Sequence, residues 1–340
     1  MRDFYDRSVT AAPGYDLPAG AIAQVPAEPR DSARLLVDRG VGREPDHWRV
    51  TDLPRLIRPG DVVVLNETRV LPARLRLTKD TGGAVEVLLL EPDGDDRTWT
   101  ALVRPSRRVA PGTVLVAGDD LEVEVGERFD DGRRRVRLVT DDVTSSLDRH
   151  GELPLPPYLS AGLDDPSRYQ TVYAARPGSV AAPTAGLHLT DRVLDRCADA
   201  GARIERLDLT VGLGTFKPVT AERLEDHDVH EEPYAVPAET MAACEAAERV
   251  IAIGTTTVRA LETAATTGAL SGRSRLLIHG EFPWRVVDAL VTNFHLPHST
   301  LLLLVEAFIG PRWRELYGTA LAHGYRFLSF GDAMWLERAR

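Results

Sequence analysis

The stretch Asp-Val-Val-Val-Leu-Asn at residues 61–66 decides how the chain is divided. Its β-branched and aliphatic run is typical of a strand buried in a sheet. The sequence then changes character, because residues 73–141 hold short β-rich segments separated by Gly, Asp and Pro, with no useful helical periodicity. This spacing predicts a small all-β sandwich or barrel. The expected strands are 84–90, 99–103, 113–116, 121–125 and 135–139.

After residue 151, helical and strand patterns alternate, which predicts an α/β layer fold. The runs at 33–37 and 61–66 are expected to belong to this same layer. We therefore expect an α/β main domain, residues 1–72 plus 150–340, with an inserted all-β, barrel-like domain at 73–149. The expected helices are 191–200, 238–248, 299–310 and 312–322, and the expected strands are 203–211, 249–253, 286–292 and 325–330.

Composition is that of an ordinary globular enzyme: 340 residues, 43% hydrophobic and 27% charged, with a net charge of −10. Cys197 and Cys244 lie far apart in helical patterns, so no disulfide framework is expected. The start of the chain lacks the apolar core of a signal peptide, and the longest apolar run, 301–305, is too short to span a bilayer. We expect a cytoplasmic monomer without a membrane partner.

Arginines cluster in one part of the chain despite the negative total charge. Two interpretations stay open, since such a cluster either binds phosphates or forms a solvated face balanced by Asp and Glu. The clustered residues are Arg69, Arg74, Arg76, Lys79, Arg104, Arg107, Arg108, Arg133, Arg134, Arg135 and Arg137.

Two segments combine small residues, proline and histidine without the rhythm of a helix or strand: 178–190, which contains His188, and 288–300. Such a segment is expected to contribute little to a core and to hold an imidazole in position. The alternative is a tight surface loop with an incidental histidine. Two segments of this kind predict one composite pocket.

Two further turns follow expected strands. Gly254-Thr-Thr-Thr-Val-Arg259 places Thr255 and Thr256 at the start of an expected helix, where backbone amides favour an anion. Arg259 could bind a carboxylate or phosphate. The alternative is an ordinary threonine helix cap with a surface arginine. Gly212-Leu-Gly-Thr-Phe lacks the third glycine of a dinucleotide fingerprint, so a Rossmann cofactor is not expected. Its glycines are expected to let a ligand lie against the backbone.

The histidines at His227-x-x-His230-Glu231 and His295-x-x-His298 lack the spacing of a helical zinc motif, so no metal is expected. We expect these histidines to transfer protons rather than to bind a metal. Glu231 beside His230 would raise the basicity of that imidazole. The alternative is that each histidine is satisfied in loop packing. Two distant cysteines also exclude an iron–sulfur cluster of the kind that cleaves S-adenosylmethionine (SAM) by radical chemistry.

Ordered motifs over nearly the whole chain resemble the SAM:tRNA ribosyltransferase-isomerase family of queuosine biosynthesis. The main ones are Tyr15-Asp-Leu-Pro, Arg30-Asp-Ser, Asn66-Glu-Thr-Arg-Val-Leu-Pro-Ala-Arg-Leu, Arg104-Pro-Ser, Leu153-Pro-Leu-Pro-Pro-Tyr, Arg168-Tyr-Gln-Thr-Val-Tyr-Ala and the segments 178–190, 211–216, 227–231, 254–262, 292–307 and 325–334.

The resemblance implies that the ribose portion of SAM is transferred to the aminomethyl group of a 7-deazaguanine base at the tRNA wobble position. The ribosyl group isomerises to an epoxycyclopentane, adenine and methionine leave, and no metal or other cofactor takes part. The reaction requires a base beside the sulfonium and an acid at adenine.

The expected roles follow from this resemblance. The acid and base candidates are His188, His230 with Glu231, and His295; the candidates for binding SAM or the base are Gly212, Gly214, Thr215, Thr255, Thr256, Arg259, Asp288, Asn293 and Asp332; the candidates for tRNA phosphates are Arg69, Arg74, Arg104, Arg107 and Arg108.

The chain departs from the family pattern at two places. Thr210 stands where a histidine is usual, and residues 277–284 read Leu-Ile-His-Gly-Glu-Phe-Pro-Trp, which introduces His279, Glu281 and Trp284. The alternative function is therefore a divergent paralogue that uses SAM on another, small-molecule acceptor. A non-catalytic RNA-binding module is a third hypothesis.

Overall fold

The computed structural model describes residues 12–212, 219, 221 and 223–339. The chain divides into two compact units. The first comprises residues 1–68, 157–176 and 183–340, and the second comprises residues 69–156 and 177–182. The expected insertion at 73–149 lies within the second unit.

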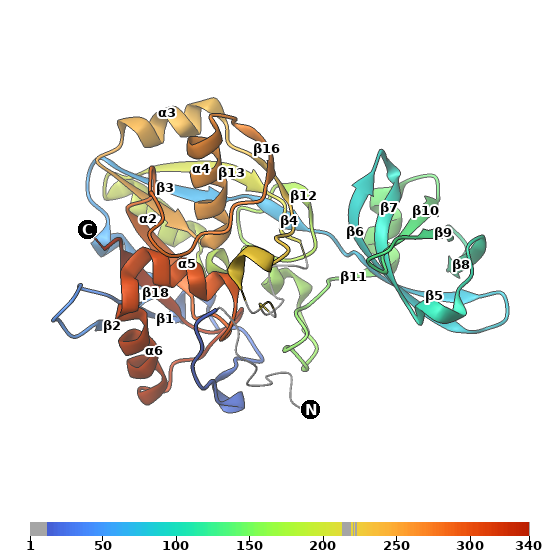
Figure 1. Ribbon diagram of the computed structural model, residues 1–340, viewed down its shortest axis with the longest axis horizontal. Coiled ribbons are helices and arrows are strands. Elements are labelled where there is room, and N and C mark those ends of the chain that lie inside the picture. Colours follow the sequence, from blue (N-terminus) through green and yellow to red (C-terminus); the bar gives the residue numbers. More distant parts are fainter. Residues whose placement is uncertain (1–11, 213–218, 220, 222, 340) are drawn as a thin grey trace. The chain divides into compact units, whose positions relative to one another are not determined.

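The described part of the first unit contains a nine-stranded sheet with the strand order β16-β14-β13-β3-β15-β17-β18-β1-β2 (Figure 1). Four neighbouring strands, β13, β3, β15 and β17, run parallel, and β18 returns antiparallel to β17. The strands are β1 (Arg34–Val37), β2 (Asp46–Arg49), β3 (Asp61–Asn66), β13 (Arg203–Leu209), β14 (Glu232–Ala235), β15 (Arg249–Ile253), β16 (Ser271–Ser274), β17 (Ala289–Asn293) and β18 (Ala333–Glu337).

Helices pack against both faces of this sheet because its central strands are apolar throughout. All six residues of β3 are buried, as its β-branched run predicts. The α-helices are α2 (Asp191–Asp199), α3 (Ala238–Ala246), α4 (Thr255–Thr267), α5 (Thr300–Ile309) and α6 (Trp313–Ala322), and the 3₁₀ helices are η1 (Ala19–Ala21), η2 (Arg30–Ser32), η3 (Val50–Leu56), η5 (Pro166–Tyr169), η6 (Thr184–His188), η8 (Leu224–Asp226) and η9 (Gly310–Arg312).

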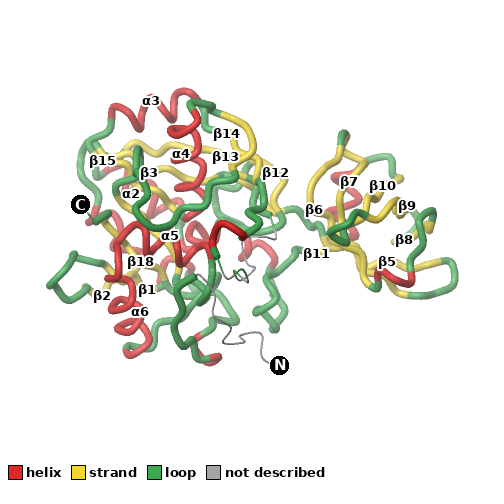
Figure 2. The backbone as a smooth tube through the Cα atoms, viewed as in Figure 1, coloured by secondary structure: helices red, strands yellow, loops and turns green. Residues whose placement is uncertain are grey.

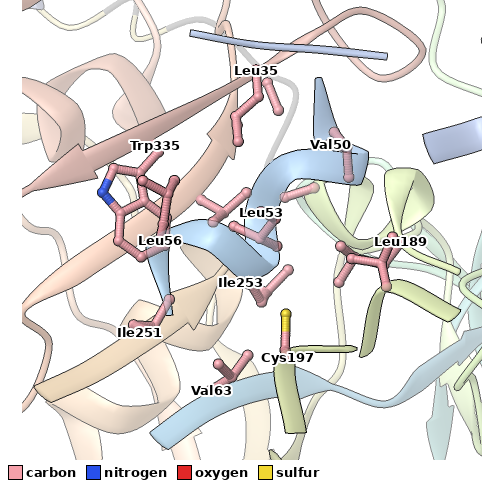
Figure 3. Close-up of a cluster of buried hydrophobic side chains, with 14 of the residues drawn as sticks. Leu35, Val50, Leu53, Leu56, Val63, Leu189, Cys197, Ile251, Ile253 and Trp335 are labelled. Carbon is pink, nitrogen blue, oxygen red and sulfur yellow. The ribbon is translucent and has the colours of Figure 1, made fainter. Parts of the chain in front are cut away.

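One face of the sheet packs against η3, α2 and η6 and forms a large apolar core. Figure 3 shows Leu53 and Leu56 of η3 among Trp335 of β18 and Ile251 and Ile253 of β15. The alternate residues of these strands point to the opposite face, where α4 contacts β3, β15 and β17 and α5 contacts β18. Two covered faces leave the strand ends as the edge at which a ligand can reach the sheet.

The second unit, whose residues are all described, is a closed antiparallel barrel with the order β5-β6-β7-β10-β9-β8, and β5 pairs with β8 to complete it (Figure 2). Its elements are β5 (Arg74–Lys79), β6 (Ala84–Asp93), β7 (Asp95–Arg104), η4 (Ser106–Arg108), β8 (Thr113–Ala117), β9 (Leu121–Arg128), β10 (Arg134–Val139), α1 (Val143–His150) and β11 (Gly151–Glu152). Two short strands, β4 (Thr68–Val70) and β12 (Arg176–Ser179), form a separate sheet.

The predicted fold class is confirmed, and so are the helix starts at Thr190 and Ser299. The Thr190 hydroxyl accepts a hydrogen bond from Val193 N at 3.2 Å, and that of Ser299 accepts one from Leu302 N at 3.2 Å. The predicted strand at 325–330 is wrong, because this segment forms turns and the strand lies at Ala333–Glu337. Leu328 has φ +69°, a left-handed value that extended pairing does not allow.

The expectation that the segment 178–190 contributes little to the core is also wrong. Ala185 and Leu189 belong to the main apolar cluster, and Gly186 packs directly on Tyr173. A Cβ atom at Gly186 would stand 1.9 Å from the Tyr173 hydroxyl. The small residues therefore serve tight packing beneath the turn that positions His188.

Candidate functional site

The candidate site lies at the carboxyl edge of the parallel strands. Asn66 ends β3, Gly254 follows β15, and Asn293 ends β17. Because β18 is antiparallel to β17 and Ala333 pairs with Asn293, Asp332 arrives at the same edge. This edge is where open α/β sheets bind ligands.

His188 is linked to β17 through the side chain of Asn293. Asn293 Nδ2 lies 2.9 Å from His188 Nε2 and also donates to the Leu328 carbonyl at 3.2 Å, while Asn293 Oδ1 accepts a hydrogen bond from the Thr184 hydroxyl at 2.9 Å. The Leu328 carbonyl can only accept, so the amide nitrogen faces His188 and donates to Nε2. Neutral His188 therefore bears its proton on Nδ1.

Burial keeps His188 neutral. Removal from water lowers the pKa of His188 to about 4, Arg326 and Arg30 lower it further, and only Asp332 acts to raise it. At neutral pH the imidazole is thus uncharged, with Nδ1 as a hydrogen-bond donor and the Nε2 lone pair bonded to Asn293.

His295 is the second buried imidazole at this edge. Its Nε2 atom lies 2.8 Å from the Thr292 hydroxyl, and its backbone accepts from Tyr15 at 2.6 Å and donates to the Tyr317 hydroxyl at 3.0 Å. Burial lowers the pKa of His295 to about 3. Both backbone groups and one ring nitrogen are fixed, so the ring is held in one orientation.

Two small cavities adjoin these histidines. The first has a volume of about 30 Å³ and the second about 10 Å³, so each holds water-sized molecules only. Ser329 lines both. The first is also lined by Tyr158, Thr184, Asn293, His295 and Ser299, and the second by Pro26, Ala27, Arg30, Arg168, Leu187 and His188. The two segments expected to form one pocket therefore meet.

Asn66 joins three elements at the point where β13 and β15 flank β3. Its Nδ2 donates to the Leu209 carbonyl at 3.0 Å and to the Thr256 hydroxyl at 3.2 Å, and its Oδ1 accepts from Leu209 N at 3.1 Å and Thr68 N at 3.2 Å. The residue is fully buried. It fixes the start of α4 relative to β13, a role the sequence analysis did not assign.

Arg259 is engaged within the protein. Its guanidinium pairs with the buried Glu232 carboxylate, which also accepts from Gly212 N at 3.0 Å, and its Nε donates to the Leu276 carbonyl at 3.1 Å. This pairing anchors the turn after β13. Thr255 and Thr256 are buried at the start of α4, whereas Gly214 and Thr215 lie outside the described residues.

Three candidate residues do not join the buried histidines in the described structure. His230 and Glu231 are exposed, and the Glu231 carboxylate binds Arg273 at 2.9 Å and Arg275 at 3.2 Å. Asp288 precedes β17, at the opposite edge of the sheet, and pairs with Arg338 at 3.1 Å.

Asp332 lies at the expected edge but its carboxylate is already bonded. It accepts from Arg34 N at 2.9 Å, Arg34 Nε at 3.2 Å and Arg326 N at 2.8 Å. Its negative charge acts on His188 from this fixed position. The carboxylate thus tunes the imidazole electrostatically.

The barrel arginines separate into two groups. Arg76, Arg133 and Arg135 form ion pairs with Glu152, Asp131 and Asp93, which is the balanced surface interpretation. In contrast, no ion pair with another described residue is found for Arg69, Arg74, Arg104, Arg107 or Arg108. All of these except Arg74 are exposed.

The turn that bears Arg107 and Arg108 is held from beneath by Arg134. This buried guanidinium donates to the carbonyls of Val109 at 2.8 Å, Ser106 at 3.4 Å and Gly126 at 3.3 Å. Removal from water lowers its pKa. A buried cation bonded only to backbone oxygens stiffens this turn and adds to its positive potential.

The departures from the family pattern are local. Trp284 packs edge-on against Phe282 and Phe308 with ring centroids 4.9 Å apart in each pair, and His279 and Glu281 are exposed. Thr210 N donates to the Pro233 carbonyl at 2.9 Å. Among the described residues, no group of three or more metal-ligating side chains and no helix long and apolar enough to cross a membrane is found.

Comparisons with known proteins agree over nearly the whole chain. A family model described as queuosine biosynthesis protein matches residues 11–336. A Rubrobacter xylanophilus protein named S-adenosylmethionine:tRNA ribosyltransferase-isomerase is 54% identical over 95% of this chain and 96% of its own, and a Thermus thermophilus protein of the same name is 49% identical over 94% and 97%. The crystal structure of a Thermotoga maritima S-adenosylmethionine tRNA ribosyltransferase matches with TM-score 0.54 and 35% identity, covering 95% of this chain and 98% of that one.

Proposed function

The chain belongs to the queuosine biosynthesis protein family, and from this premise we propose that the buried turns of His188 and His295 bind SAM and move the protons of the reaction. The enzyme is a SAM:tRNA ribosyltransferase-isomerase. It transfers the ribosyl moiety of SAM to the 7-aminomethyl-7-deazaguanine base at the tRNA wobble position and isomerises it. The product is epoxyqueuosine, and adenine and methionine are released. No relative reported above supports a different acceptor.

The observation that supports the site most directly is the Thr184–Asn293–His188 network at the sheet edge. Positive sulfur acidifies the 5′ hydrogens of SAM, so a neutral imidazole nearby can remove one; for His188 to do so, Nε2 must exchange its hydrogen bond from Asn293 for the proton. The low pKa values of His188, about 4, and His295, about 3, keep both rings in the required uncharged form. His230 and Glu231 stay predictions for proton transfer.

The remaining assignments follow the edge of the sheet. We assign the nucleoside to the side of the edge bordered by Gly212, Thr255 and Thr256, where α4 begins without a side-chain cap. Asn293 positions His188, Asp332 acts on it through its charge, and both side chains are already hydrogen-bonded within the protein. Arg69, Arg104, Arg107 and Arg108, which have no ion pair among the described residues, are assigned to tRNA phosphates. We further propose that the enzyme works as a cytoplasmic monomer without another cofactor.

The test measures adenine release from SAM with tRNA that bears 7-aminomethyl-7-deazaguanine. We expect release that depends on the tRNA, and a loss of about a hundredfold or more in His188→Ala and His295→Ala. His279→Ala is the matched control, because His279 is exposed. Full turnover by His188→Ala would remove that histidine from the mechanism, and adenine release with a small-molecule acceptor would favour the alternative function.

A further inference from the structure

We propose that Arg30 and Arg168 form a carboxylate site beside His188, and that this site binds the amino-acid carboxylate of SAM. The inference rests on the proposed function and assigns a contact that the sequence motifs gave to Arg259. Arg259 already has the buried Glu232 carboxylate as its counter-ion, whereas Arg30 has no ion pair among the described residues, which favours Arg30 for this contact.

The second cavity brings two guanidinium groups to the wall that contains His188. Arg30 and Arg168 both line it, and their elements, η2 and η5, lie far apart in sequence. The adjoining first cavity shares Ser329 and is lined by His295. A ligand spanning both cavities would therefore have its anionic end at the arginines and its reacting centre near the imidazoles.

Arg30 is a partly buried cation without a counter-ion. Its Nη1 donates to the carbonyls of Gln170 at 2.9 Å and Leu187 at 3.4 Å, and no ion pair joins it to a carboxylate within the described ranges. Burial lowers its pKa, whereas Asp165 and Asp191 raise it only through longer-range attraction. A cation removed from water in this way is stabilised by an anion that binds it directly.

Arg168 can also donate hydrogen bonds to a ligand carboxylate. Its Nε atom is buried and has no hydrogen-bond partner in the described structure, while Nη2 donates to the Ala27 carbonyl at 2.7 Å. Its ion-pair partner, Glu28, is 75% exposed, and such pairs are weak. A ligand carboxylate would displace the Glu28 carboxylate from Arg168. It therefore need not fit entirely within the second cavity, whose volume is about 10 Å³. The planar fork of arginine suits this exchange.

The reaction itself supplies a suitable anion, the carboxylate of SAM. A short carbon chain joins this carboxylate to the sulfonium. A tRNA phosphate is bulkier and is linked on two sides to the nucleic-acid backbone. The small, partly buried cavity therefore favours the carboxylate. This contact would hold the sulfonium in place while the ribosyl group reacts.

The test compares dissociation constants, measured by calorimetry, for SAM and for decarboxylated SAM, which lacks only the carboxylate. We expect wild-type protein to bind SAM about tenfold or more tightly than the analogue. In Arg30→Gln the preference should disappear, because SAM binding weakens while analogue binding is unchanged. Arg192→Gln is the matched control, since Arg192 is exposed and pairs with the neighbouring Asp31 at 3.1 Å.

Several results would overturn the proposal. Equal binding of the two ligands by wild-type protein would exclude a carboxylate site, whether or not any variant folds. An unchanged preference in both Arg30→Gln and Arg168→Gln would exclude these arginines. Weaker tRNA binding in Arg30→Gln with an intact SAM preference would assign the cation to a phosphate instead. A wild-type protein that bound no SAM would contradict the proposed function itself, which distinguishes the two failures.

Discussion

The Nδ2 atom of Asn293 donates a hydrogen bond to Nε2 of His188 over 2.9 Å, and this contact sets the tautomer of the imidazole. The amide cannot turn around without placing its oxygen against the Leu328 carbonyl. Asn293 thus acts as a positioning residue, and the state of His188 depends on a neighbour more than 100 positions away in sequence.

Replacing Asn293 with Asp should weaken the preference of His188 for the neutral form. A carboxylate beside Nε2 stabilises the imidazolium and raises the pKa by about one to three units. We expect kcat for adenine release to fall about tenfold or more and the acidic limb of its pH profile to move upward. ¹⁵N NMR of wild-type protein should show the proton of His188 on Nδ1. Thr184→Val, which retains the amide donor, is the control, and an N293D profile identical to wild type would refute the positioning role.

The two buried histidines should make the protein less stable in mild acid. Their pKa values, about 4 for His188 and about 3 for His295, lie below the ordinary value of about 6.5. Between pH 6.5 and pH 4 the unfolded chain binds more protons at these histidines than the folded protein does. The free energy of unfolding therefore falls as the pH decreases through this range, by several kcal/mol in total.

Urea unfolding at pH 7 and pH 5 measures this loss. His188→Gln should show a smaller difference between the two pH values than wild type, while His279→Gln, at an exposed position, should behave like wild type. Equal stability of wild-type protein at both pH values would show that these imidazoles are not buried as described.

Asn66→Ala should destabilise the protein by about 2–4 kcal/mol, because the buried backbone groups of Leu209 lose their partners. Thr256→Val, which removes only one hydrogen bond of Asn66, should cost about 1 kcal/mol. Thermal or urea unfolding measures both. A smaller loss in N66A than in T256V would contradict the linking role of Asn66.

Arg107 and Arg108, which have no ion pair among the described residues, should contribute to the salt dependence of tRNA binding. The double substitution Arg107→Gln and Arg108→Gln should reduce the steepness of the plot of log association constant for tRNA against log salt concentration by about 1.5. Arg135→Gln is the matched control, because its guanidinium already pairs with Asp93 at 2.7 Å. Equal slopes for all three proteins would make these arginines ordinary solvated surface.

The fold could be predicted where hydrophobic pattern dominates. The buried run at 61–66 and the spaced β segments after it correctly divide the chain into a layered domain and a barrel. The prediction failed at 325–330, whose apolar residues are buried in turns. A Cβ atom at Gly331 would stand 2.4 Å from the Arg326 carbonyl oxygen, so this turn depends on a close approach of two backbone segments that pattern does not reveal.

The site was predicted in part. His188, Asn293 and His295 stood out because glycine and proline mark their turns. Glu232 was missed although it follows Glu231 directly, since β14 begins at Glu232 and buries its side chain, whereas Glu231 lies before the strand and is exposed. The proposed role of Arg30 has no signal in the sequence, because its cavity combines η2, η5 and η6, and no local pattern indicates that these elements meet.

The central claim is that SAM binds at the sheet edge between the turns of His188 and His295. The most direct measurement is a crystal structure of the protein with SAM. We predict the sulfonium adjacent to these two imidazoles, with the carboxylate on Arg30. SAM bound in full occupancy at a place remote from both histidines would contradict the account.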